Sequence, residues 1–171
     1  RAHSGLEPWM LLNLAGALRD LGRDAEAAEA GQRALTRTHD HTFNEHNIWL
    51  AVDAGFVGDR ASAERLLANV DEKEISDYRR FLFRIAQALA AISGEPVPLS
   101  AVAYARAVDR LRGLFRLVPT FLKEPALHRY LGRALWRIVR ARGGNTLAAL
   151  GLWFYFVLVV IWLSPPAASA P

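Results

Sequence analysis

The stretch Leu11–Leu35, LLNLAGALRDLGRDAEAAEAGQRAL, decides the expected fold. Between Leu11 and Leu18, apolar residues recur at i, i+3, i+4 and i+7, the spacing of an amphipathic helix. Gly22 is expected to end this helix, because glycine readily adopts the left-handed conformation found at helix ends. Asp24 is expected to cap the next helix. That second helix carries small residues on one face, at Ala27, Gly31 and Ala34. Small residues allow two antiparallel helices to approach closely, so we expect an αα-hairpin.

Further copies of this pattern follow along the chain. The second copy has its corresponding residues at Leu50, Ala51, Ala54, Gly58, Asp59, Ala63 and Leu67. Gly22, Gly58 and Gly94 are evenly spaced, 36 residues apart. Gly94 follows the helical run Ile75–Ile92, and the next helix is expected to start near Leu99 or Ser100. A regular period of this length is typical of helical repeat proteins, so we expect an all-α fold.

The pattern resembles the tetratricopeptide repeat, which has a period of about 34 residues. In the first copy the family's positions are filled by Leu11, Leu14, Ala15, Leu18, Gly22, Ala27, Gly31, Ala34 and Leu35. The Trp, Tyr and closing Pro of the family are replaced by Leu11, Leu18 and His39. The resemblance covers about Glu7–Arg116 and weakens along the chain. It implies a TPR-like solenoid of helical hairpins over residues 1–117; an irregular helical bundle is the alternative.

The resemblance also implies that a partner binds in a groove formed by the first helix of each hairpin. The groove positions of the family fall on Trp9, Leu12, Arg19, Asp20, Glu45, Ile48, Val52, Phe56, Phe81, Arg84 and Ala88. The paired Lys and Asn that clamp a C-terminal carboxylate in some family members are missing from these positions. The mostly apolar groove suits an apolar helix or extended segment of a partner. Equally, a later helix of the same chain, such as Leu99–Leu117, can fill it.

Residues 118–145 are expected to form a basic juxtamembrane segment. Pro119 is expected to break the chain's helical pattern and Pro125 to start a new helix, Ala126–Arg142. Its apolar face carries Leu127, Leu131, Ala134, Leu135 and Ile138, and its arginines are Arg129, Arg133, Arg137, Arg140 and Arg142. Such a helix can lie on anionic lipid headgroups or cap the solenoid. The alternative is an ordinary solvated basic face.

The stretch Thr146–Leu163, TLAALGLWFYFVLVVIWL, is uncharged and is expected to be a transmembrane helix. As a helix it is roughly 27 Å long, close to the thickness of a bilayer's hydrocarbon core. Because the preceding segment is rich in arginine and the tail 164–171 has no Lys or Arg, the positive-inside rule places the repeats in the cytoplasm. We therefore expect a single-pass protein of a bacterial inner membrane. Arg1 is not an initiator Met, so the chain is expected to belong to a longer or processed protein.

Two features of this span indicate contact with another transmembrane helix. Gly144, Ala148 and Gly151 share one face, and small residues permit close helix packing in lipid. Trp153 and Tyr155 lie within the span, where their polar N–H and O–H groups need partners. The alternative is that the small residues have no such role.

Composition and motifs argue against several kinds of chemistry. The chain has no cysteine, which excludes disulfides and thiolate sites. The net charge is +4 and no nucleic-acid-binding motif is present, so we expect no nucleic-acid partner. His39, Asp40, His41, Glu45 and His46 form the only cluster resembling a metal site, and we interpret it as a solvated loop that binds no metal. No catalytic or cofactor motif appears, so we expect neither enzyme activity nor a cofactor.

These observations predict a membrane-anchored TPR-like scaffold that binds a protein partner at the cytoplasmic face. The alternative is an accessory subunit of an integral membrane complex, in which the transmembrane helix is the main interface. A third hypothesis is an enzyme with its catalytic part upstream of Arg1.

Overall fold

The computed structural model describes residues 6–36, 43–144, 151, 153–154 and 156–158. These residues form helices, turns and connecting segments and contain no strand, which confirms the all-α prediction for this part of the chain. Across the same residues, no helix combines the length and the apolar character that crossing a bilayer requires. The predicted span 146–163 lies mainly outside the described residues.

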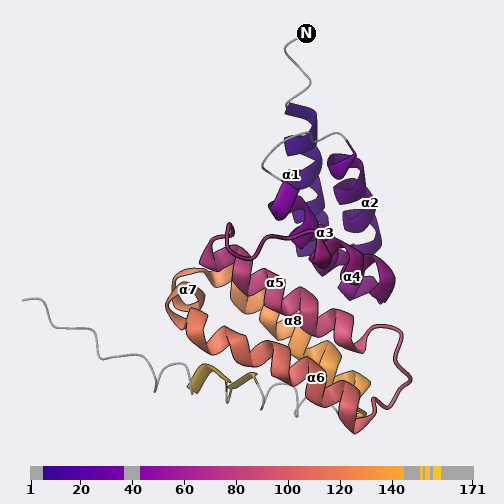
Figure 1. The fold of residues 1–171 in the computed structure, drawn as a ribbon, viewed down its shortest axis with the longest axis vertical. Coiled ribbons are helices and arrows are strands. Elements are labelled where there is room, and N and C mark those ends of the chain that lie inside the picture. The colour runs from indigo at the N-terminus through magenta and orange to yellow at the C-terminus, as the bar shows by residue number, and fades with distance from the viewer. Residues whose placement is uncertain (1–5, 37–42, 145–150, 152, 155, 159–171) are drawn as a thin grey trace, which may run out of the picture.

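The N-terminal part is a series of antiparallel helix pairs (Figure 1). The helices are α1 (Leu6–Asp20), α2 (Asp24–Leu35), α3 (Phe43–Val57), α4 (Arg60–Ala68), α5 (Asp77–Ile92) and α6 (Ala101–Arg112). Each pair packs on the next, since α2 contacts α3, and α3 and α4 contact α5. The three expected hairpins are therefore α1–α2, α3–α4 and α5–α6.

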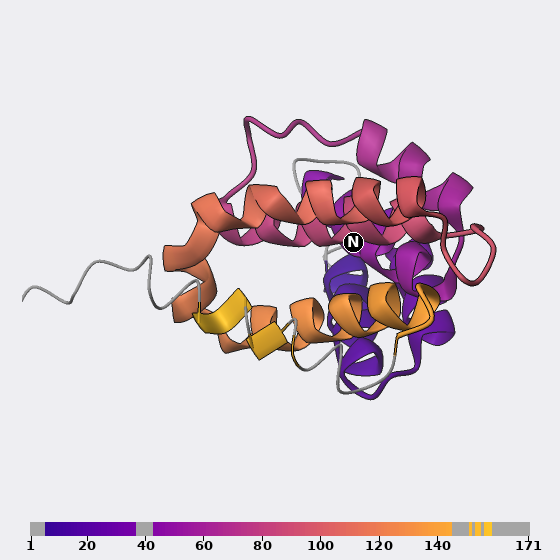
Figure 2. The same ribbon diagram turned by 90° about the horizontal axis from the view of Figure 1, so that it is seen from below.

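The chain then returns along the hairpins. A 3-10 helix, η1 (Gly113–Leu117), leads into α7 (Val118–Lys123) and α8 (Pro125–Ala141). In Figure 2, α6 and α8 form two sides of the C-terminal half and are joined at one end by η1 and α7. The long helix α8 packs against α5.

Glycines end α1 and α3 in the predicted conformation. Gly22 has φ +73° and Gly58 has φ +88°, which confirms the prediction of positive φ at both positions. The amide of Gly22 donates to the Arg19 carbonyl (2.9 Å), and the next amide, of Arg23, donates to Leu18 (2.9 Å). The amides of Gly58 and Asp59 make the equivalent bonds to Gly55 and Ala54. This is the Schellman arrangement, which satisfies carbonyls at a helix end.

The third evenly spaced glycine ends its hairpin turn differently. Gly94 also has positive φ (+73°), but Ser93 before it is extended, and the Glu95 amide donates to Ile92 (3.3 Å). These features define a type II turn, which requires glycine or asparagine at its third position. The following helix starts at Ala101, with the Ser100 hydroxyl accepting from the Ala103 amide (3.1 Å), as predicted.

Two predicted local roles are wrong. Asp24 is the first residue of α2 and makes no cap; the N-cap is Arg23, which has no side-chain capping bond. The Asp24 carboxylate instead accepts from Arg133 on α8, a charged donor that its own helix cannot offer. Pro119 does not interrupt a helix. It lies in the first turn of α7, where its missing N–H has no intrahelical partner to lose.

The main core surrounds α5. Fully buried residues of α5, Phe81, Leu82, Ile85 and Leu89, join the predicted apolar face of α8, Leu127, Leu131, Ala134, Leu135 and Ile138. The small residues of α2 divide their roles between two neighbours. Ala27 packs with Ala15 and Leu18 of α1, as predicted. At Gly31, a Cβ would lie 2.6 Å from a methyl of Leu50, so this glycine makes room for α3 and not for α1.

Candidate functional site

The predicted partner groove is covered by the chain itself. Arg19 is 2 % exposed, Ile48 1 % and Phe56 5 %, so these three predicted groove residues are buried. Leu12 and Arg84 are partly exposed, and the structure does not describe the side chain of Trp9. The covering helix is α8, which places the guanidinium of Arg133 4.3 Å from the centre of the Phe56 ring. The segment Leu99–Leu117 packs against α5, and its Gly113 lies beside the predicted groove residue Arg84.

A buried ion pair lies beneath α8 and joins α1 to α3. Arg19 donates from Nε and Nη2 to the two carboxylate oxygens of Asp53, and Nη2 lies 3.0 Å from Oδ2. The Arg19 guanidinium also lies 4.4 Å from the centre of the Trp49 ring, within the range of a cation–π contact. Asp53 is fully buried, and this burial raises its pKa to about 6, against the opposing effects of Arg19 and Arg133. A planar bidentate pair of this kind fixes the relative positions of both helices.

Arg133 of α8 binds the turn between α1 and α2. It donates to both oxygens of Asp24 (2.6 and 2.8 Å) and to the backbone carbonyl of Arg19 (3.0 Å). That carbonyl belongs to the last turn of α1, where carbonyls carry the negative end of the helix dipole.

Arg137, one helical turn further along α8, binds the end of the second hairpin's first helix. It donates to the backbone carbonyl of Phe56, in the last turn of α3. Burial lowers the pKa of Arg137. Arg142 donates to the Leu99 carbonyl (2.5 Å), ahead of α6. Arginines four residues apart on α8 therefore contact equivalent ends of successive hairpins.

The predicted membrane-surface arginines thus have different surroundings. Arg133, Arg137 and Arg142 donate hydrogen bonds within the chain, as described above. Arg129 lies 3.4 Å from Asp20 in an exposed ion pair, and Arg140 is exposed. Contact of any of them with lipid headgroups stays a prediction.

A cavity of about 510 Å³ remains between α8 and the hairpins. Phe56 and Trp136 line it together with Arg133, Arg137 and Arg140. Two of these three arginines already donate to Asp24 and to the Phe56 carbonyl. Phe56 is the one predicted groove residue in its described lining.

Three of the five predicted span-packing residues, Gly144, Gly151 and Trp153, lie within the described residues. The Gly144 amide donates to the Val139 carbonyl (2.8 Å), and a Cβ at Gly144 would lie 2.5 Å from the Val139 side chain. Gly144 therefore belongs to the turn that ends α8. The close approach of Val139 in this turn explains why a residue without a side chain stands there. Gly151 is exposed with open space around it, and Trp153 lies beside Gly132 of α8. Ala148 and Tyr155 lie outside the described residues.

The histidine cluster is described only in part. Glu45 forms an ion pair with Arg79, and His46 is buried. His39, Asp40 and His41 lie outside the described residues. Within the described ranges, no three His, Asp or Glu side chains are placed to hold a metal ion.

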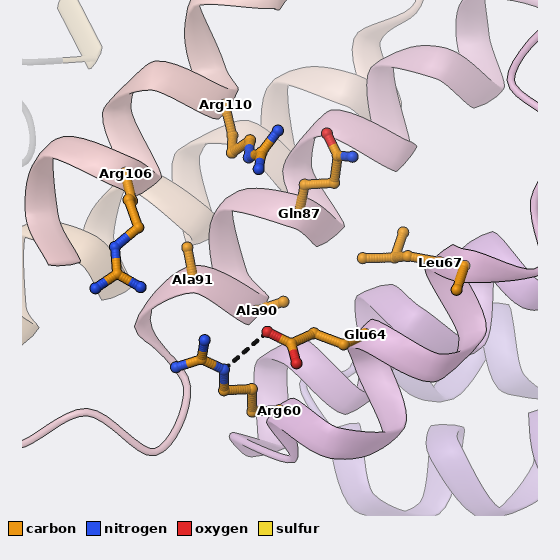
Figure 3. A pocket seen from close by; sticks show the side chains of 9 residues that line it. Arg60, Glu64, Leu67, Gln87, Ala90, Ala91, Arg106 and Arg110 are labelled. Carbon is orange, nitrogen blue, oxygen red and sulfur yellow. Dashed lines mark hydrogen bonds and ion pairs between the residues drawn. The ribbon is translucent and has the colours of Figure 1, made fainter.

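A second hollow lies on the other side of the hairpins, between α4, α5 and α6 (Figure 3). We call it the α4–α6 cleft; its volume is about 380 Å³, and its lining includes Arg60, Glu64, Leu67, Gln87, Arg106 and Arg110. Arg60 donates to Glu64 (2.8 Å) and to Glu95 (3.1 Å), so its charge is balanced locally. Ala91 of α5, which is partly exposed, adds apolar surface.

Arg106 and Arg110 differ from Arg60, the third arginine of the cleft, in having no partner among the described residues. Both are exposed, and neither makes a hydrogen bond or ion pair within the part of the chain that the structure describes. They also line a neighbouring hollow of about 490 Å³ on the outer side of α6, with Val102 and Asp109. Exposed guanidinium groups that have no acceptor among the described residues can bind carboxylates or phosphates bidentately.

The sequence interpretation did not single out Asp53, Arg106 or Arg110. A signal existed for Asp53, because a carboxylate within the apolar stretch of α3 must be paired when the helix is buried. Arg106 and Arg110 are four residues apart on one helix face, which was visible, but the apolar neighbours from α4 and α5 depend on tertiary structure.

Comparisons of the chain with protein-family models, with curated protein sequences and with solved structures find no match.

Proposed function

We propose that the chain is a membrane-anchored scaffold of TPR-like hairpins that holds a partner protein at the cytoplasmic face. The arrangement of α1–α6 supports the repeat assignment, because successive antiparallel pairs pack in order and glycines with positive φ recur every 36 residues. The segment 146–163 supplies the anchor in this proposal.

The position of α8 decides the choice of binding surface, because α8 covers the face of α1 and α3 where a partner was predicted to bind. Arg19 and Phe56 are buried beneath it, and Arg133 and Arg137 hold it there. A partner therefore binds on the opposite face, where Arg106 and Arg110 are exposed and unpaired within the described residues.

Purification of the full chain from membranes in mild detergent, followed by mass measurement of intact complexes, tests this function. We expect a stoichiometric soluble partner that is released at about 0.5 M salt, where electrostatic attraction is screened within a few ångströms. Carbonate washing should leave the chain in the membrane, and protease added outside intact cells should leave the hairpins uncut. Release by carbonate or external digestion would contradict the anchored, cytoplasmic arrangement.

The second candidate is an accessory subunit of a membrane complex. Phe154 is 60 % exposed and Leu158 is 57 % exposed, whereas Phe156 between them packs against Phe115 and Phe121. Large exposed apolar side chains of this kind suit lipid or a neighbouring transmembrane helix. A membrane partner that resists salt but is lost after Ala148→Ile and Gly151→Ile would favour this role over the scaffold.

A further inference from the structure

We propose that the α4–α6 cleft binds an acidic segment of a partner protein that presents two carboxylates about one helical turn apart. This inference rests on the proposed scaffold function and names the chemistry of its partner.

The charge balance of the cleft favours an anionic occupant. The lining contains Arg60, Arg106 and Arg110 against a single carboxylate, Glu64. Arg60 already donates to that carboxylate and to Glu95, so the unbalanced positive charge comes from α6. The two α6 arginines are exposed and make no hydrogen bond or ion pair with any described residue.

The spacing of these two arginines sets the spacing of the ligand. Residues four apart on a helix have Cβ atoms about 5–6 Å apart. Two carboxylates on neighbouring turns of a helix, at i and i+4, have the same separation, so each can receive one guanidinium. Each such pair is planar and bidentate, which gives orientation as well as attraction.

The neutral part of the cleft suits the remainder of a peptide. Leu67 and Ala91, both partly exposed, provide apolar contacts for an aliphatic side chain (Figure 3). Arg84 donates to the side-chain oxygen of Gln87 (2.9 Å), which leaves the Gln87 amide nitrogen as a donor for a ligand carbonyl. A combination of paired cations, an amide and apolar surface matches an acidic peptide with one apolar residue.

The same lining disfavours the other common anions. None of the lining residues is aromatic, so the cleft offers no ring for a nucleic-acid base to stack on. The lining residues come from three helices, α4, α5 and α6, around a hollow, which a broad bilayer does not enter.

Peptide binding to the full chain in detergent micelles tests the proposal. The probe is a fluorescein-labelled, alanine-based peptide of about 16 residues, long enough to form a helix. It carries two Glu four residues apart and one Leu on the same face. Matched peptides carry Gln in place of both Glu, or place the two Glu on opposite faces. We expect the first peptide to bind and both matched peptides to bind at least about tenfold more weakly, a difference in Kd that fluorescence anisotropy resolves.

Charge-matched protein variants locate the binding site. Arg106→Gln with Arg110→Gln removes both proposed ligands. Arg33→Gln with Arg65→Gln removes two exposed arginines of α2 and α4 that do not line the cleft. The first pair is expected to raise the Kd at least about tenfold and to flatten its salt dependence, and the second to change the Kd less than about twofold. A charge-reversed chain, Arg106→Glu with Arg110→Glu, is expected to bind the peptide in which Lys replaces both Glu.

Several results would overturn the proposal. The first is failure of the acidic peptide to bind the unmodified chain. The second is an equal rise in Kd for both variant pairs. The third is equal affinity for peptides with the two Glu on the same face and on opposite faces. Displacement by inorganic phosphate as effective as excess unlabelled peptide would show a phosphate site. Displacement by phosphatidylserine vesicles would show a lipid site.

Failure of this inference differs from failure of the scaffold function. If a partner co-purifies equally with the unmodified chain and with Arg106→Gln/Arg110→Gln, the cleft assignment is wrong and the scaffold function stands. If no partner co-purifies with the unmodified chain, the scaffold function itself is wrong.

Discussion

Two pairs of arginines with the same spacing have opposite surroundings in this molecule. Arg133 and Arg137 are four residues apart on α8, and both donate to acceptors on the hairpins. Arg106 and Arg110 are four residues apart on α6, and neither has an acceptor among the described residues. The difference arises across the helix interface, since α8 faces the last turns of α1 and α3, where the carbonyls of Arg19 and Phe56 accept from its arginines.

This comparison separates a stabilising role of arginine from a binding role. On the inner side, Arg133 and Arg137 hold α8 against α1, α2 and α3, and the Arg19–Asp53 pair joins α1 to α3 beneath it. On the outer side, Arg106 and Arg110 of α6 make no hydrogen bond or ion pair with any residue that the structure describes. Substitutions should therefore affect stability on the inner side and partner binding on the outer side.

The largest expected effect comes from breaking the buried pair. Asp53→Ala leaves the guanidinium of Arg19 buried without its carboxylate, and we expect the free energy of unfolding to fall by about 3–5 kcal/mol. Chemical denaturation of the full chain in detergent, followed by circular dichroism, measures this loss. The matched control is Asp109→Ala, whose carboxylate is exposed and 3.8 Å from Arg112; its expected change is within about 0.5 kcal/mol. Equal effects of both variants would contradict the stabilising role of the buried pair.

The pH dependence of stability tests the charge state of the same pair. The pKa of Asp53 is raised from 3.8 to about 6 in the folded chain, so between these values the folded state binds a proton that the unfolded state has lost. Stability is therefore expected to fall as pH rises from about 4 to 6, by roughly 2–3 kcal/mol in total, and to stay level above that window. Arg19, Asp24, Arg133 and Tyr130 are the charged or titratable groups around Asp53.

Comparison with Asp53→Asn isolates this contribution. The free energy of unfolding is measured for both proteins from pH 4 to 7. The value for the unmodified protein minus that for Asp53→Asn should fall between about pH 4 and 6 and stay level above that window. If the unmodified protein instead gained stability relative to Asp53→Asn as pH rises, Arg19 would lower the pKa of Asp53 more than burial raises it.

The third prediction compares the two arginine pairs directly. Arg133→Gln removes bonds to Asp24 and to the Arg19 carbonyl, and we expect it to lower the free energy of unfolding by about 2 kcal/mol. Arg106→Gln, on α6, should change it by less than about 0.5 kcal/mol. Both substitutions remove one positive charge, so net charge is the same in the two variants. A loss of stability in Arg106→Gln as large as in Arg133→Gln would mean that α6 has a stabilising contact that the described residues do not contain.

The sequence predicted the local features of the fold and missed those that depend on helix–helix contacts. Helix ends at Gly22 and Gly58 were predictable because a left-handed terminus depends mainly on the residue itself. The apolar face of α8 was predictable from its periodicity. The position of α8 over the groove was not, because an amphipathic helix can cover apolar surface of lipid, of a partner or of its own chain.

Two sequence assignments differ from the structure for different physical reasons. Asp24 was predicted to cap α2, but a guanidinium from a distant helix is a stronger partner than a local amide. Gly144 was assigned to a packing face in the span, whereas its amide belongs to the turn after α8. The Asp24 contact comes from a distant helix, which local spacing does not encode. The Gly144 contact is local, because Gly143 has φ +89° and the next amide donates to a carbonyl five residues earlier, as at the ends of α1 and α3.

The smallest expected effect concerns two glycines that differ only in their relation to α8. Gly22→Ala and Gly58→Ala each force a side chain into positive φ, at a cost of about 1 kcal/mol or somewhat more. At Gly22 nothing lies near the added Cβ, but at Gly58 the Arg137 Nη2 lies 3.3 Å from it. We therefore expect Gly58→Ala to lose more stability than Gly22→Ala in the same denaturation experiment. Gly16→Ala, within α1, is the control and should raise stability slightly, because alanine favours a helix interior. Equal losses at the two turns would mean that Arg137 moves aside freely, so its bond to the Phe56 carbonyl would contribute little to holding α8 in place.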